Sequence, residues 1–121
     1  LVVGSADVYK RQAQGDVSRL PLEAETFDLI TAFETVYFWP GPMESFQEVL
    51  RVLKPGGAFM IVNESDGMNL ADEKWTVMID GMRIFNQEQL MQYLQDAGFS
   101  RISAHVNQEQ HWLCLLAEKA R

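Results

Sequence analysis

From residue 22 onward, segments whose apolar residues are spaced as in a strand alternate with segments whose apolar residues are spaced as on one face of a helix. Residues 27–33 (FDLITAF) and 58–64 (AFMIVNE) are short apolar runs, which are typical of strands covered on both faces. Between them, residues 42–53 carry apolar side chains at the spacing of one helix face, which predicts an amphipathic helix. That face consists of Phe46, Val49, Leu50 and Leu53. A proline and two glycines, residues 55–57, predict the end of this helix and a tight reversal.

The region from residue 65 to 82 leaves this alternation, and we expect it to pass over one end of the sheet. Asn69 is placed to cap a short helix whose apolar stripe falls on Trp75, Met78, Ile79 and Met82. For Met78 and Met82 we favour a place in the core over a place in a substrate pocket.

A third helix is predicted after Asn86, which forms a capping box with Gln89. Leu90, Met91, Leu94 and Ala97 form its inward face, and Gly98 ends it. Two strands follow: residues 101–107 alternate in polarity, and residues 112–118 are almost continuously apolar, which favours a strand covered on both faces.

Strands that alternate with helices predict an α/β fold with parallel strands. The last two strands are joined by a link too short for a crossover, so we expect an antiparallel hairpin at the edge of a mixed sheet. About four strands come from this chain, which is fewer than a doubly wound sheet usually contains.

Composition narrows the classes of function. The chain has 121 residues, of which 47% are hydrophobic, and a formal net charge of -7, which argues against binding to nucleic acid. No apolar run is long enough to span a bilayer, so no membrane association is expected. A single cysteine, Cys114, and the lack of a secretory apolar region favour a cytoplasmic location. The oligomeric state is left open.

Four short motifs lie in a fixed order: Gly15-Asp16, Leu20-Pro21, Phe27-Asp28 and RVLKPGG at residues 51–57. With Ala97-Gly98-Phe99 and the closing strand, they resemble the class I S-adenosylmethionine-dependent methyltransferases, in the methyltransferase type 11-like branch that acts on small molecules. The resemblance implies a Rossmann-like fold, S-adenosylmethionine as cofactor, and methyl transfer to a small-molecule substrate. A nucleotide-binding oxidoreductase fits the alternation of elements but not these motifs.

The resemblance also implies a set of cofactor-binding residues. They are Asp16, Val17, Thr31, Ala32, Phe33 and Tyr37. Asp16 matches the acidic residue that accepts a hydrogen bond from the adenine amino group, although from its type alone it is a turn residue. Among the neighbouring aromatic residues we expect Tyr37 to reach the site, where a ring would attract a sulfonium cation. Phe38 or Trp39 is expected to fill the core.

The catalytic residues are not assigned, because a general base is needed only if the acceptor carries a proton at neutral pH. Glu34, Tyr37 and Glu64 are the candidates, since each lies near the carboxyl end of a predicted strand. For both glutamates a role as an ordinary strand-end carboxylate is an equal alternative. His105 and His111 are interpreted as a strand side chain and a hairpin residue, and no Cys or His spacing indicates a metal.

The beginning of the sequence raises a separate question. Asp7–Gln12 (DVYKRQ) match the in-frame translation of a transposon-end sequencing adapter, so we expect residues 1–12 to be non-native; the alternative is a native third strand. The family's first strand with its GxGxG loop is absent, so we expect residues 13–121 to be the carboxyl-terminal part of a methyltransferase domain, inactive by itself. The alternative is a naturally short, non-catalytic Rossmann-like binding module.

Overall fold

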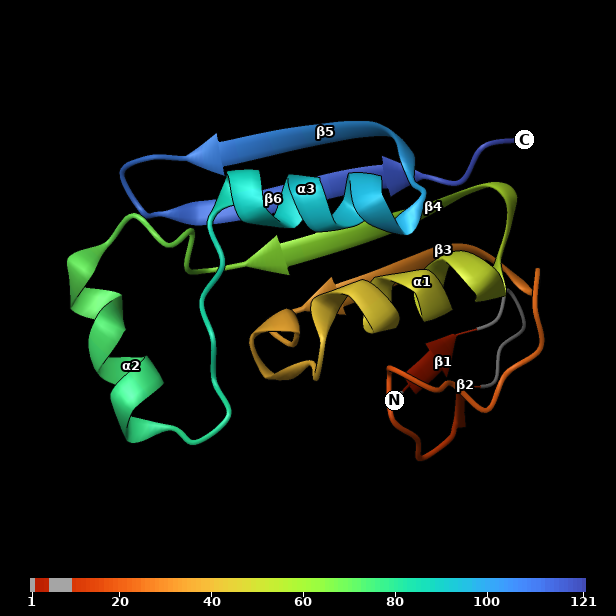
Figure 1. Ribbon diagram of the computed structural model, residues 1–121, viewed down its shortest axis with the longest axis horizontal. Helices are drawn as coiled ribbons and strands as arrows, with labels where there is room; N and C mark the ends of the chain where they lie inside the picture. The colour runs from red at the N-terminus through yellow and green to blue at the C-terminus, as the bar shows by residue number, and fades with distance from the viewer. Residues whose placement is uncertain (1, 5–9) are drawn as a thin grey trace.

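The computed structural model describes residues 2–4 and 10–121. Its main sheet has four strands, β3 (Phe27–Phe33), β4 (Leu53–Asn63), β5 (Ser100–Asn107) and β6 (Trp112–Glu118), in the order β3-β4-β6-β5. β3 and β4 are parallel, whereas β6 runs antiparallel to both of its neighbours (Figure 1). The predicted α/β fold, with a mixed sheet that ends in an antiparallel edge hairpin, is therefore confirmed.

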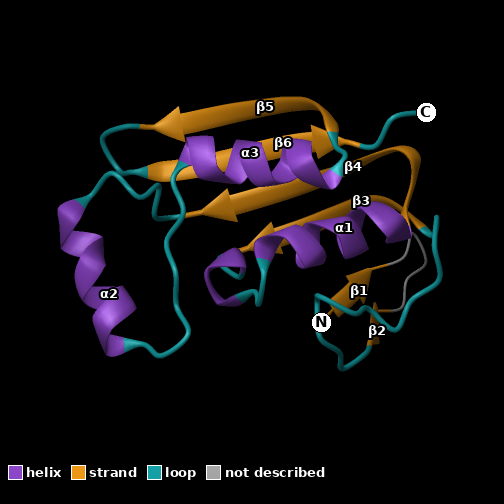
Figure 2. Cartoon of the chain, in the orientation of Figure 1, coloured by secondary structure: helices purple, strands orange, loops and turns teal. Residues whose placement is uncertain are grey.

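Two helices lie on the same face of this sheet (Figure 2). They are α1 (Pro42–Val52) and α3 (Gln87–Ala97), and they also pack against each other. Between helices and sheet lies one apolar core in which Phe46, Phe59 and Leu94 are fully buried. None of the helices in the described part of the chain is long and apolar enough to span a membrane.

The ends of both helices follow from local chemistry. Pro42 stands in the first turn of α1, and at the other end the Lys119 ammonium donates to the carbonyl oxygens of Leu50 and Leu53, both at 2.9 Å. The predicted capping box of α3 is present, since Asn86 and Gln89 bond each other's backbone N–H groups. Gly98 ends α3 with φ of 112°, a conformation that favours glycine.

The prediction that β3, β4 and β6 are covered on both faces was wrong. In β4, as in β6, buried residues alternate with partly exposed ones from Ala58 to Asn63. Leu29 and Phe33 of β3 are 57% and 56% exposed. In β6 the buried residues alternate with partly exposed ones, so that Leu113 and Leu115 are buried but Cys114 is not. The physical reason is that the described helices cover only one face of the sheet, and β3 has only β4 beside it.

The excursion between β4 and α3 contains a 3-10 turn, η2 (Leu70–Asp72), and the short helix α2 (Glu73–Met78). Asn69 caps this turn as predicted, because its side chain accepts a hydrogen bond from the N–H of Ala71. The expected place of Met78 in the core was wrong, since this side chain is 72% exposed. α2 extends beyond the end of the sheet (Figure 1), where no core is available to cover its apolar stripe; Met82 is partly buried.

The beginning of the chain forms a second, two-stranded antiparallel sheet from β1 (Val2–Gly4) and β2 (Lys10–Gln12). Neither strand joins the main sheet. The expectations for residues 1–12, non-native sequence or a native third strand, fall in part on residues 1 and 5–9, which lie outside the described residues.

Candidate functional site

The short sequence motifs meet one another in the fold. The N–H of Leu20 donates to Oε1 of Glu48 at 2.8 Å, and Nη2 of Arg51 donates to the carbonyl oxygen of Leu20 at 3.1 Å. Arg51 also pairs with Glu48 at 2.7 Å, and the hydrogen bond from Arg51 lowers the pKa of the Glu48 carboxyl. Thus α1 holds the loop that contains Leu20 through one charged pair.

A second contact joins the Phe27-Asp28 and Lys54–Gly57 motifs. A Cβ atom at Gly57 would lie 2.9 Å from the carbonyl oxygen of Lys54 and 3.1 Å from that of Asp28, so only glycine fits there. Lys54 forms an exposed ion pair with Asp28 at 3.8 Å. These motifs therefore fix the register of β3 on β4 and the position of the loop before β3, and their role is structural.

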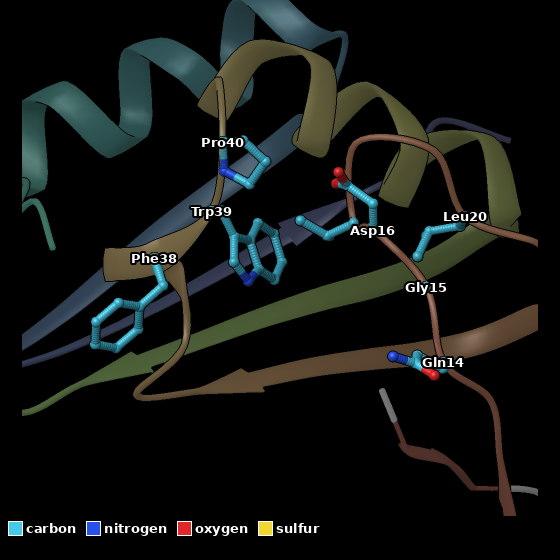
Figure 3. A pocket seen from close by; sticks show the side chains of 8 residues that line it. Gln14, Gly15, Asp16, Leu20, Phe38, Trp39 and Pro40 are labelled. Atoms are coloured by element: carbon cyan, nitrogen blue, oxygen red, sulfur yellow. The ribbon is translucent and has the colours of Figure 1, made fainter. Parts of the chain in front are cut away.

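The loop held in this way forms one wall of a cavity of about 590 Å³ (Figure 3). The opposite wall is the segment after β3. The lining residues are Gln14, Gly15, Asp16, Val17, Leu20, Phe38, Trp39 and Pro40. This volume is in the range of small-molecule sites. The cavity combines an exposed carboxylate with aromatic side chains, a lining that suits a heteroaromatic ring with amino groups.

Asp16 is both a turn residue and a cavity residue. Its Oδ1 accepts hydrogen bonds from the N–H and the hydroxyl of Ser18, at 2.8 and 2.7 Å. These bonds, the one from the Ser18 hydroxyl first, lower the pKa of Asp16, so its carboxylate is ionised at neutral pH. Oδ2 accepts no hydrogen bond from the residues described, which leaves an acceptor for a ligand N–H group.

Phe38 and Trp39 form an aromatic wall of the cavity, and one of the two rings is partly buried while the other is exposed. The Trp39 ring stacks on Phe59, with centroids 5.9 Å apart and planes 4° apart, and meets Phe46 edge to face. Trp39 thus belongs to the core and also lines the cavity. The expectation that Phe38 or Trp39 fills the core is confirmed for Trp39, whereas the Phe38 ring is 49% exposed and borders the cavity. Phe38 lies in a short 3-10 turn (η1, Val36–Phe38) between β3 and α1, and its place in this strand-to-helix connection is the signal in the sequence.

The three candidate bases come together at the carboxyl ends of β3 and β4. The Tyr37 hydroxyl donates to Oε1 of Glu34 at 3.1 Å and accepts a bond from the N–H of Ser65 at 3.0 Å. The N–H of Glu64 donates to the same Glu34 oxygen. Tyr37 is buried, and burial raises its pKa well above the usual value, so the hydroxyl remains protonated. The cluster therefore ties two strand ends together.

The predicted cofactor residues fall into two groups. Asp16 and Val17 line the cavity. Thr31, Ala32 and Phe33 form the end of β3, with Ala32 buried and the other two exposed, and neither they nor Tyr37 line it. The motifs did not point to Leu20 and Pro40 as cavity residues; only the contact of two distant segments places them there.

The sequence has relatives of known class. Residues 3–61 match the family model described as a methyltransferase domain. The chain is 30% identical over 112 residues to cycloartenol-C-24-methyltransferase 1 of Oryza sativa subsp. japonica, covering 84% of this chain and 31% of that protein. It is 27% identical over 89 residues to 2-methyl-6-phytyl-1,4-hydroquinone methyltransferase 1 of the same plant, covering 74% of this chain and 26% of that protein. The chain thus spans less than a third of these relatives.

The fold has a counterpart among solved structures. A SAM-dependent methyltransferase from Thermotoga maritima superimposes with a TM-score of 0.74 at 22% identity, over 87% of this chain and 61% of that one. A TM-score of 0.74 over this share of the chain shows that the two proteins have the same fold. From the family match, the sequence relatives and the fold together, we conclude that the chain belongs to the class I S-adenosylmethionine-dependent methyltransferases.

Proposed function

We propose that this chain is the carboxyl-terminal part of a methyltransferase domain, and that the complete domain transfers a methyl group from S-adenosylmethionine to a small-molecule acceptor. The observation that carries the proposal is the cavity between the Asp16 turn and the Phe38–Pro40 segment. In our proposal this cavity holds the adenine end of the cofactor, and the ends of β3 and β4 face the reacting groups.

The lining residues support an adenine ligand. The ionised Asp16 carboxylate has a free oxygen that can accept a hydrogen bond from an exocyclic amino group. The Phe38 and Trp39 side chains line the cavity and offer apolar contact to a flat ring. The turn at Asp16 fixes the direction of its carboxylate before the ligand arrives, which reduces the entropy lost on binding.

The cofactor, when bound, supplies an activated methyl group on a sulfonium. The work left to this chain is positioning and exclusion of water. The Tyr37 hydroxyl holds the segment after β3 against Ser65. The backbone carbonyl of Tyr37 accepts a hydrogen bond from the backbone N–H of Arg83 at 2.8 Å. The same residue therefore connects the aromatic wall with the end of the 65–85 excursion, and we propose that this excursion bounds the acceptor.

The acceptor in our proposal has a large apolar part. The named relatives are methyltransferases of cycloartenol and of 2-methyl-6-phytyl-1,4-hydroquinone. In this chain the excursion exposes Leu70, Val77 and Met78, and exposed apolar side chains that lie together mark a surface used for binding.

The test is a titration of adenosine into the chain labelled with ¹⁵N, read from backbone amide signals. We expect the amides of Gly15, Val17 and Phe38 to shift, and Asp16→Asn to weaken binding by about tenfold, because a charged acceptor is replaced by a neutral one. Asp28→Asn is the matched control, since Asp28 is an exposed carboxylate on β3, away from the cavity. Shifts spread over the whole chain, or equal affinity in Asp16→Asn, would contradict the proposed site.

The same substitution tests the activity in a complete domain that carries these residues. There Asp16→Asn should raise KM for S-adenosylmethionine about tenfold and leave kcat nearly unchanged, because the adenine contact is made equally in the ground state and the transition state. A complete domain that binds adenosine at Asp16 but transfers no methyl group would favour the non-catalytic binding module instead.

A further inference from the structure

A second cavity, of about 640 Å³, lies between the start of α3 and the turn that joins β5 to β6. Asp66 and Met68 border it from the beginning of the excursion, Glu88 from α3, and Val106 and His111 from the hairpin. None of these residues belongs to the cavity at Asp16. The methyltransferase motifs do not include them either.

Two polar side chains of this cavity, His111 and Asp66, contact each other. Nδ1 of His111 lies 3.2 Å from Oδ1 of Asp66, whose side chain is only 6% exposed. The same carboxylate oxygen accepts a hydrogen bond from the N–H of Met68 at 2.9 Å, so its position is fixed by the backbone. Because a carboxylate can only accept, the bond requires a hydrogen on Nδ1 of His111.

This arrangement determines what the other ring nitrogen can do. With the hydrogen on Nδ1, the neutral ring presents a lone pair at Nε2. Nε2 has no hydrogen-bond partner among residues 2–4 and 10–121, and the His111 side chain is 31% exposed. The ring thus offers an oriented acceptor to a ligand in the cavity.

The cavity also lies at the edge of the sheet where ligands are expected. Asn63, the last residue of β4, pairs with Leu113, two residues after His111. The hairpin turn is therefore at the same edge as Glu64 and the Glu34–Tyr37 cluster, which is the carboxyl edge of the parallel strands. Open α/β sheets bind their ligands at this edge.

The remaining lining residues narrow the class of ligand. Asp66 and Glu88 are acidic, and no Lys or Arg is among the lining residues that the structure describes, so an anionic ligand is disfavoured. Met68 and Val106 present apolar surface, since both are substantially exposed. A neutral molecule with an apolar body and a hydroxyl group satisfies both features.

We propose that this cavity binds the hydroxyl-bearing part of a neutral small molecule, whose hydroxyl donates a hydrogen bond to Nε2 of His111 while Asp66 holds the ring. This proposal rests on the proposed function in so far as that molecule is the methyl acceptor. His111 is then a binding residue that selects acceptors with a hydroxyl group, and Asp66 is a positioning residue.

The experiment is an NMR titration of the full chain with hydroquinone, compared with 1,4-dimethoxybenzene, which keeps the ring but has no hydroxyl hydrogen. The chain has two histidines, so the ¹⁵N signals of the two imidazoles can be assigned, and the exposed His105 on β5 is an internal reference. We expect hydroquinone to shift the Nε2 signal of His111 and not that of His105. We expect dimethoxybenzene to bind about five- to tenfold more weakly, since one hydrogen bond is lost.

A matched pair of variants completes the test. His111 has φ of 59°, a conformation that asparagine tolerates better than most residues, so His111→Asn removes the ring with little backbone strain. It should weaken hydroquinone binding about five- to tenfold, whereas His105→Asn should leave it unchanged. Equal binding of the two probes to the unmodified chain, or equal affinity in His111→Asn, would overturn the proposal.

The result of the hydroquinone titration can be distinguished from the result of the adenosine titration that tests the proposed function. Adenosine binding is read at Gly15, Val17 and Phe38, and hydroquinone binding is read at His111. If adenosine fails to bind and hydroquinone binds as expected, only the cofactor site is contradicted. If adenosine binds and hydroquinone does not, the methyltransferase proposal stands and the hydroxyl site is wrong.

Discussion

The Tyr37 hydroxyl lies 3.1 Å from Oε1 of Glu34 and accepts a hydrogen bond from the N–H of Ser65 at 3.0 Å. Glu34 follows β3 directly and Ser65 comes shortly after β4, so one side chain joins the ends of two parallel strands. Because burial raises the pKa of Tyr37, the hydroxyl keeps its hydrogen and can donate and accept at once. This relationship makes Tyr37 a structural link at the proposed site.

Replacement of Tyr37 by phenylalanine should therefore destabilise the fold. The ring remains, but the Glu34 carboxylate loses a donor and the N–H of Ser65 loses its acceptor. We expect a loss of about 1–2 kcal/mol in the free energy of unfolding, measured by urea denaturation. Tyr93→Phe is the control, because no hydrogen bond of the Tyr93 hydroxyl is found among the described residues; equal losses in the two variants would contradict the role of Tyr37.

Stability in acid should depend on the Glu48–Arg51 pair. The folded-state pKa of Glu48 is lowered from 4.5, first by its hydrogen bond from Arg51. A lowered carboxyl pKa contributes stability above the unfolded value, and this contribution is lost as the pH falls through the folded value. Since Arg51 is 37% exposed, solvent screens the pair and we expect its contribution to be about 0.5–1 kcal/mol.

Glu48→Gln tests this dependence, because glutamine keeps an acceptor for the N–H of Leu20 but has no charge to pair with Arg51. The difference in unfolding free energy between the original chain and the variant should be largest near neutral pH and should shrink as the pH falls below 4.5. Denaturation curves at several pH values measure it. A difference that grows in acid would have the wrong sign and would exclude the pair as its source.

The sequence predicted the elements of the fold well where the signal is local. The capping box at Asn86 and the stop at Gly98 are set by neighbours a few residues away, so α3 is found where the pattern places it. The parallel pairing of β3 with β4 and the closing hairpin follow from connection lengths. The exposure of Leu29 was missed because an apolar run shows only that a strand is hydrophobic. It does not show which face of the sheet is covered by helices.

The site was predicted only in part, for the same reason. Asp16 could be placed from a motif, whereas Phe38 borders the cavity because the loop of Leu20 is held opposite it by α1. The contact between Asp66 and His111 joins residues 45 positions apart. No periodicity encodes such a contact, and from sequence His111 was simply a hairpin residue.

The two aromatic residues at the first cavity should respond differently to truncation. Trp39→Ala removes a ring that stacks on Phe59 and meets Phe46 in the core, so we expect a loss of about 2–4 kcal/mol in unfolding free energy. Phe38→Ala removes a half-exposed ring and should cost less than about 1 kcal/mol. Thermal and urea denaturation measure both. If Phe38→Ala proved the more costly change, the division into a buried and an exposed wall would be wrong.

The apolar residues of α2 should contribute little to the stability of the fold. Val77 and Met78 are largely exposed, and α2 lies beyond the end of the sheet (Figure 1). Val77→Lys and Met78→Gln should therefore change the unfolding free energy by less than about 0.5 kcal/mol, the usual range for surface positions. Leu94→Ala in α3 is the contrast, because this fully buried side chain should cost about 2–5 kcal/mol.

In a complete domain the same α2 variants separate stability from acceptor binding. If the excursion contacts an apolar acceptor as proposed, Val77→Lys should raise KM for that acceptor, because a charged group would be placed on the contact surface. KM for S-adenosylmethionine should not change, since the Asp16 cavity contains no residue of α2. A variant that lost stability as Leu94→Ala does would show instead that α2 is packed against another part of the complete domain.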